Sequence, residues 1–251
     1  MASQIIVDQL KKTGGVLTEL TLPSANATVG QYLKNDGAGV LGWVDPPADV
    51  SGFHNVKFVT ATDTSVDLTS GTTLIVVEVQ GAGGSAGGSN SVSYYGGCGG
   101  AGGYSLQQLT VVDTDTWNVT IGAGGVDGAT RDGGDTIFAQ QTGTSLGSTI
   151  TAGGGAGATD GTSPHTDGGA GGTVTNANTG AFNMTGSDCA AGSHDKGGPD
   201  SRWGWGGIKR VAGNGAGGNA SGYGAGGGDS SGSSQLGGEG SDGLVVIWEY
   251  K

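Results

Sequence analysis

Glycine recurs at every third residue in several stretches of this chain, and this spacing restricts the fold more than any other feature. Such series of glycines lie within 81–87, 122–128, 169–172, 215–227 and 237–243. Three residues per turn is the period of the polyproline II helix, in which every third residue lies on the same edge. The stretch "GGCGGAGGY" (96–104) contains two such series, one formed by Gly96, Gly99 and Gly102 and the other by Gly97, Gly100 and Gly103. An edge made of glycine carries no side chains, so neighbouring backbones can approach and hydrogen-bond.

A flexible linker is the usual interpretation of glycine-rich sequence, because glycine loses the most backbone freedom on folding. Here the glycines are phased, and strand-like runs rich in β-branched and aromatic residues interrupt them at 72–80, 104–112, 116–124, 136–141 and 243–250. Of 251 residues 58 are glycine but only 5 are proline, which excludes collagen. We therefore predict a mainly β and irregular fold. Short strands form a platform for a packed bundle of polyglycine II helices, with very little α-helix.

The strands must supply the apolar burial that glycine cannot. The predicted core consists of Val76, Val77, Val79, Leu109, Val119, Ile121, Ile137, Val245, Val246 and Trp248. Residues 96–103 carry glycine on two edges, so we expect this segment inside the bundle, with Cys98 and Ala101 on its third edge. A valine at Gly99 or Gly100 is expected to abolish folding.

Charge and hydropathy exclude several classes of function. Asp and Glu number 22 against 10 Lys and Arg, and the formal net charge is −12, so the basic stripe that nucleic-acid binding needs is absent. No apolar run has the length of a membrane span, and no signal-peptide pattern begins the chain. We expect a protein made in the cytoplasm, with no nucleic-acid partner and no membrane insertion.

Catalytic and metal-binding patterns are also missing. His54, His165 and His194 are far apart, and the triad-like letters "SHD" (193–195) place neighbouring side chains on opposite faces of an extended chain. No glycine-rich loop is followed by a helix pattern, and no calcium-loop alternation occurs. The expectation is a protein that is not an enzyme and has no cofactor and no metal.

The two cysteines, Cys98 and Cys189, both lie in glycine-rich surroundings. Two free, packed small side chains are the interpretation that the sequence favours. A disulfide is the alternative, and it would suit a protein that works outside the cell.

Composition divides the chain into three parts. Residues 1–50 alternate short apolar pieces with turn signals such as "NDGAG" (35–39) and "DPP" (45–47). Residues 51–72 form a connecting β segment, and 73–251 are the glycine-rich part. We expect the first part to attach the chain to a larger assembly or to its own copies.

Two resemblances suggest what that assembly is. "LPSANATVGQYLKNDGAGVLGWV" (22–44) resembles a short module of bacteriophage tail-fibre and other virion proteins. The second part resembles the glycine-rich domain of phage receptor-binding tips, through "LIVVEVQGAGG" (74–84), "GGAGGYS" (99–105), "DTWNVTIGAGG" (115–125), "GGDTIF" (133–138), "ITAGGGAG" (150–157) and "GSDGLVVIWEY" (240–250). These resemblances imply a virion protein, commonly a homotrimer, that contacts other virion proteins and a glycan or outer-membrane component of the host surface.

The loops that join the glycine helices are the expected contact region. The interruption at 175–214 is richest in aromatic and charged residues, and Trp203 and Trp205 face the same way if that part is extended. They would form a stacking platform for a sugar ring beside Arg202, or else the local core of a domain short of apolar groups. The predicted receptor-binding residues are Trp203, Trp205, Arg202, Tyr94, Tyr95 and Phe182.

The first functional hypothesis is thus a phage fibre that binds the host surface through its tip loops. The alternative is a structural fibre that decorates the capsid or tail and binds no receptor. An ice-binding protein is a third class, but it would require a regular exposed face that these interrupted repeats lack.

Overall fold

A computed structural model describes residues 23–29, 31–35, 41–44, 52–91, 94–128, 130–162, 166–189, 197–208 and 215–251. The chain divides into two compact units, Met1–Ser51 and Gly52–Lys251. In the smaller unit β1 (Tyr32–Asn35) pairs antiparallel with β2 (Leu41–Val44). These strands flank the predicted "NDGAG" turn, most of which lies outside the described residues. The Trp43 indole N–H donates to the carbonyl of Ala25 at 2.8 Å.

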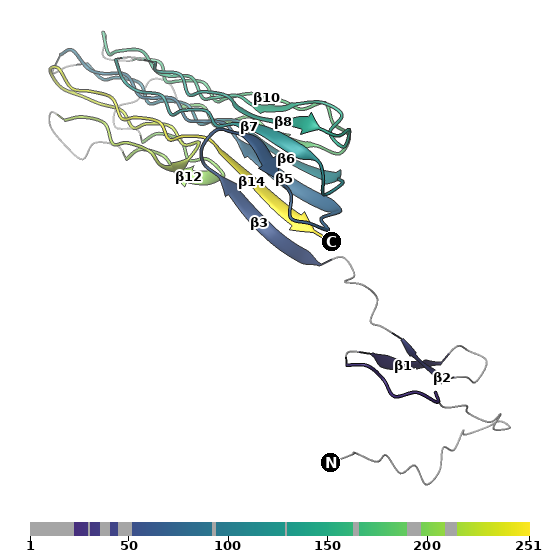
Figure 1. Cartoon of the computed structure of the whole chain (residues 1–251). Helices are drawn as coiled ribbons and strands as arrows, with labels where there is room; N and C mark the ends of the chain where they lie inside the picture. Colours follow the sequence, from purple (N-terminus) through teal and green to yellow (C-terminus); the bar gives the residue numbers. More distant parts are fainter. Residues whose placement is uncertain are drawn as a thin grey trace, which may run out of the picture. The chain divides into compact units, whose positions relative to one another are not determined.

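The larger unit contains two five-stranded antiparallel sheets, with strand orders β10-β9-β8-β7-β4 and β11-β6-β5-β14-β3, and a two-stranded β12-β13 pair (Figure 1). The first sheet contains β4 (Asp63–Asp67), β7 (Thr116–Thr120), β8 (Thr136–Thr142), β9 (Ile150–Ala152) and β10 (Val174–Thr175). The second contains β3 (Phe53–Val59), β5 (Leu74–Gln80), β6 (Tyr104–Thr110), β11 (Phe182–Met184) and β14 (Leu244–Tyr250). The remaining pair is β12 (Trp203–Trp205) and β13 (Ser221–Tyr223). No α-helix occurs in the described ranges, so the prediction of a mainly β fold is confirmed.

The hydrophobic core lies between the two large sheets. At its centre the ring of Trp117 stacks on Phe138, with centroids 4.7 Å apart, and both side chains are fully buried. Of the predicted core residues, Val77, Val79, Leu109, Val119 and Val245 belong to this cluster and Ile121 packs against it. Val76 and Trp248 are only half-buried and lie directly opposite each other in the β5–β14 register. They occupy the outer face of their sheet, because successive residues of a strand point to opposite sides.

Glycine-rich segments continue from the strands and pack side by side as a bundle (Figure 1). The segment 81–88, which follows β5, is buried throughout and sits at the centre. Its backbone N–H groups donate in rotation to three neighbours: Gly81 to Gly103, Ala82 to Gly134 and Gly83 to Ser241, after which Gly84, Ser85 and Ala86 repeat the order. Its carbonyls accept from Gly155, Gly125 and Gly227 of three more segments. The three-residue period read from the sequence is therefore the period of the hydrogen-bond partners.

The segment 96–103 shows why its edges are glycine. A Cβ on Gly96, Gly99 or Gly102 would lie about 2 Å from a carbonyl oxygen of the segment 81–87. A Cβ on Gly97, Gly100 or Gly103 would meet the carbonyls of Asp167, Ala170 or Gly172 and Thr173 instead, at 2.0 to 2.9 Å. Both edges thus contact backbone, as the sequence predicted for a segment inside the bundle.

The third edge of this segment corrects the favoured interpretation of the cysteines. Cys98 and Cys189 are joined as a disulfide, with their Cα atoms 5.7 Å apart and a sequence separation of 91 residues. The bond ties 96–103 to the segment 185–189, whose Ser187 carbonyl also accepts the N–H of Ala101. Cys98 is buried, as expected, but neither cysteine is a free thiol.

Aspartates complete the hydrogen bonding where glycine segments lack a further neighbour. The N–H of Gly157 donates to Asp132 at 2.7 Å and that of Gly171 to Asp188 at 2.7 Å. The same bond joins Gly124 to Asp242, Gly154 to Asp135, Gly206 to Asp200, Gly237 to Asp127 and Gly88 to Asp160. A buried or half-buried N–H without an acceptor is destabilising, so part of the acidic composition serves the fold.

Candidate functional site

The end of the bundle that lies away from the sheets gathers turns from distant parts of the sequence. Isolated bridges join Ser89 to both Gly161 and Gln235, and join Ser231 to both Tyr95 and Gly215. We call this region the distal end, defined by 88–91, 94–95, 126–128, 130, 159–162, 215 and 231–236. It exposes Leu236 (66 %) and Val126 (41 %), two apolar side chains on otherwise small and polar turns.

An ion cluster stiffens this distal end. The Arg131 guanidinium lies 2.6 Å from Asp160 and 3.1 Å from Asp127. Both carboxylates also accept glycine N–H groups, from Gly88 at 2.8 Å and Gly237 at 2.7 Å. The hydrogen bond to Asp160 raises the pKa of Arg131, although burial opposes this, so the cation is stable at any working pH. Five glycine segments are thereby held together where their turns begin.

Tyr94 and Tyr95, predicted to bind a receptor, lie at the distal end and are half-buried. The Tyr94 carbonyl accepts the hydroxyl of Ser89 at 2.7 Å, and the Tyr94 N–H donates to the carbonyl of Ser91 at 3.1 Å. Their backbone is thus part of the turn that joins 81–88 to 96–103.

Trp203 and Trp205, the other predicted contact residues, lie at the opposite end of the bundle, on β12 beside the second large sheet. Trp203 is half-buried and packs edge-on against Phe58, with centroids 6.2 Å apart, whereas Trp205 is 74 % exposed. The Arg202 guanidinium carbon lies 5.9 Å from the centroid of the Trp203 ring. The segment 96–103 separates this group from Tyr94 and Tyr95 by about 25 Å at the polyproline II rise.

The Trp203 indole belongs to a buried cluster around Glu78 of β5. This carboxylate accepts hydrogen bonds from the Tyr104 hydroxyl at 2.8 Å and from the indole N–H groups of Trp203 at 3.1 Å and Trp248 at 2.9 Å. Burial, followed by the hydrogen bond to Glu78, raises the pKa of Tyr104, and Arg202 opposes this shift only in part. Tyr104 is therefore a neutral hydroxyl donor, and the cluster anchors β12 to the sheet.

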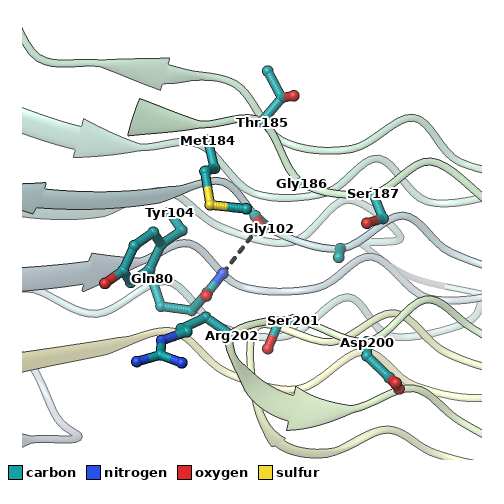
Figure 2. Close-up of a pocket in the computed structure, with 11 residues that line it drawn as sticks. Gln80, Gly102, Tyr104, Met184, Thr185, Gly186, Ser187, Asp200, Ser201 and Arg202 are labelled. Carbon is teal, nitrogen blue, oxygen red and sulfur yellow. Dashed lines mark hydrogen bonds between the residues drawn. The ribbon is translucent and has the colours of Figure 1, made fainter. Parts of the chain in front are cut away.

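A cavity of about 270 Å³ lies beside this cluster, between the segments Met184–Ser187 and Asp200–Arg202 (Figure 2). Its lining also includes Gln80, Ala101, Gly102 and Tyr104. A second hollow, lined by Asp200–Trp205, adjoins it and shares Asp200, Ser201 and Arg202. We call the first cavity the flank cavity.

Phe182 of β11 is 54 % exposed and lies two residues before Met184, on the same side of the strand. The predicted residues thus fall into two places: Tyr94 and Tyr95 at the distal end, and Arg202, Trp203, Trp205 and Phe182 near the flank cavity. Lys209 and Arg210, which the sequence places beside the tryptophans, lie outside the described residues. Whether either group contacts a receptor stays a prediction.

Sequence reasoning missed Glu78, Gln80 and Tyr104. Glu78 and Gln80 alternate with valines in "VVEVQ" (76–80), and this alternation would have assigned both polar side chains to the outer face of β5. No sequence signal indicated that β12 covers part of this face.

Among the described residues no three His, Cys, Asp or Glu side chains are grouped as metal ligands would be. The same residues contain no helix long and apolar enough to cross a membrane.

Comparison with known families adds one finding. The glycine-rich domain family matches residues 59–250, which covers most of the chain and all of both large sheets except the first residues of β3. No curated protein matches the chain.

Proposed function

The chain belongs to the glycine-rich domain family, and on this basis we propose that it is a bacteriophage fibre protein that binds the host cell surface through its distal end. The proposal joins the family membership to the resemblance of residues 22–44 to virion-protein modules. The smaller unit would attach the chain to the particle, and the fibre would assemble as a homotrimer with other virion proteins.

The distal end carries this proposal. Turns from several segments meet there, and the backbone network and the Arg131 ion cluster fix their positions. Loops on a rigid scaffold can vary in sequence without disturbing it, which suits recognition of a host surface. Leu236 and Val126 are exposed, and the half-buried Tyr94 and Tyr95 belong to the same set of turns.

Binding of the fluorescently labelled full chain to a panel of bacterial strains, measured by flow cytometry, tests the proposal. Leu236→Asp places a charge at an exposed distal position and should lower binding at least tenfold on any strain that the parent chain stains. Val112→Asp is the matched control, because Val112 is 59 % exposed just after β6, at the other end of the unit. Equal loss in both variants, or staining unchanged by Leu236→Asp, would argue against the distal end.

The alternative is a structural fibre that decorates the capsid or tail and meets no receptor. It predicts particles that carry the chain, located by immunogold labelling, while the isolated chain stains no strain that the phage infects. Light scattering after size-exclusion chromatography tests the trimer independently, since a monomer mass would contradict it.

A further inference from the structure

The flank cavity arises from the packing order of the glycine segments. Around 96–103 the N–H groups of Gly99, Gly100 and Ala101 donate to three different segments, through Gly227, Ala156 and Ser187. The carbonyls of Gly100 and Ala101 accept from two more, through Gly84 and Gly172. The carbonyl of Gly102 points in the sixth direction, where a side-chain amide, that of Gln80, donates to it at 3.0 Å. The central segment 81–88 has glycine-segment neighbours in all six directions. Around 96–103 the cavity takes the place of the sixth neighbour.

The Gln80 amide has one fixed orientation. Its nitrogen donates to the carbonyls of Gly102 at 3.0 Å and Gly103 at 3.1 Å, so the oxygen must point the other way. Gly224, at φ +75°, lies against the same side chain, and a Cβ there would come within 2.5 Å of its Cγ. Gln80 is only 1 % exposed, and within the described part of the chain its amide oxygen has no hydrogen-bond donor. In Figure 2 this oxygen lies on the side of the amide away from Gly102, toward Arg202.

A buried amide oxygen without a donor is costly, typically about 1–3 kcal/mol, unless a hydroxyl or water reaches it. The remaining walls indicate which donor fits. Met184 gives an apolar wall that is half exposed and unbranched, so it can rotate to admit a ligand. The exposed Thr185, Ser187 and Arg202 add hydroxyl and guanidinium groups at the rim.

We propose that the flank cavity binds a single sugar ring of a hydroxyl-rich glycan. One sugar hydroxyl donates to the Gln80 amide oxygen, Arg202 donates to sugar oxygens at the rim, and the apolar face of the ring packs on Met184. A volume of about 270 Å³ is just below the range of drug-sized pockets, which suits one ring rather than a longer ligand.

An anion is a poorer occupant than a neutral sugar. Asp200 shares the rim with Arg202, the Glu78 carboxylate lies just behind Tyr104, and the chain carries a net charge of −12. A donor is what the Gln80 oxygen lacks, and a carboxylate or phosphate offers none. This site is independent of the proposed host binding at the distal end, because it lies at the other end of the segment 96–103.

Saturation-transfer NMR with the full chain tests the proposal directly. The probes are free glucose, galactose, mannose and N-acetylglucosamine, and titration gives an affinity for each. At least one should bind, with its signal strongest on the ring protons of one face. Arg202→Ala and Met184→Ala, both at exposed positions, should each weaken that binding roughly five- to tenfold, the loss expected for one hydrogen bond or one apolar contact.

Gln80→Met removes the buried acceptor and should abolish binding, provided that its thermal unfolding shows an intact fold. Val112→Ala is the control, since this exposed side chain lies outside the cavity, and its affinity should match that of the parent chain. The proposal is overturned if none of the four sugars binds. Binding that persists unchanged in Arg202→Ala and Met184→Ala would likewise overturn it.

Discussion

A single methyl group on Gly99 should destabilise the larger unit by several kcal/mol. The Cβ of Gly99→Ala would lie 2.0 Å from the carbonyl oxygen of Gly84, about 1.4 Å short of the 3.4 Å at which ordinary contact begins. Neither side can yield cheaply, because the obstructing atom belongs to backbone at the centre of the bundle. The segments 81–88 and 96–103 must separate instead.

That separation breaks the three backbone hydrogen bonds that join these two segments directly: Gly81 to Gly103 at 2.8 Å, Gly84 to Gly100 at 2.9 Å and Gly87 to Gly97 at 2.9 Å. If one buried group of each broken bond is left without a partner, at about 1–3 kcal/mol per group, the sum is about 3–9 kcal/mol. Reduced freedom of the unfolded chain returns only about 0.4–1 kcal/mol. Because small domains are stable by about 5–15 kcal/mol, the substitution should remove much of that stability.

Urea unfolding followed by tryptophan fluorescence measures this loss, because the buried Trp117 reports on the core between the sheets. Hydrogen exchange of the glycine amides reports on the bundle itself. Ala170→Val is the control: Ala170 is exposed on a neighbouring glycine segment, so added methyl groups there should change stability little. If Gly99→Ala stays within about 1 kcal/mol of the parent chain and its amides remain protected, close backbone packing does not hold the bundle together.

Three further changes test other parts of the fold. Replacing both Cys98 and Cys189 by alanine opens a loop of 91 residues and should lower the free energy of unfolding by about 4–5 kcal/mol in the chain-entropy estimate, and a reductant should lower the melting temperature of the parent chain alone. Asp132→Ala removes the acceptor for Gly157 and should cost about 1–2 kcal/mol in urea unfolding, whereas Asp132→Asn keeps an acceptor oxygen and should cost less; equal losses would mean that charge rather than the hydrogen bond matters. Burial raises the pKa of Glu249, but hydrogen bonds from Thr69 and the Lys57 ammonium at 3.0 Å outweigh it, so the pKa lies below its ordinary value. Its contribution is therefore complete above the ordinary value and is lost as the pH falls below about 4, so Glu249→Gln should reduce the melting temperature at neutral pH and flatten its fall in acid; parallel curves for the two proteins would contradict this.

Residue pattern predicted the long strands well and the short ones poorly. The runs at 72–80, 104–112, 116–124, 136–141 and 243–250 each contain a strand, because β-branched and aromatic residues concentrate there. The connecting β segment predicted at 51–72 contains both β3 and β4, which belong to different sheets. β9 to β13 contain only two or three residues each, too few for an alternating pattern to show.

The faces of the strands were harder to assign than their positions. β5 reads "LIVVEVQ", so apolar residues fall on both faces, and the sequence does not say which set is inside. The structure buries Ile75, Val77 and Val79 between the sheets. Val76 and Glu78 lie on the opposite, outer face. That face is still partly buried, because β12 covers part of it.

The same reasoning explains why the sequence favoured free cysteines over the disulfide and did not indicate the flank cavity. A three-residue period reveals which edges of a segment approach other backbones, and it did so for both glycine edges of 96–103. It does not identify the neighbour on each edge, because every glycine segment offers nearly the same groups. Pairing Cys98 with Cys189 requires knowing that 185–189 lies on the third edge. Recognising the cavity requires knowing that a glutamine amide, rather than a sixth neighbouring glycine segment, meets Gly102. Specificity in such a fold therefore resides in the few residues that interrupt the glycine pattern, and these are where binding sites should be sought.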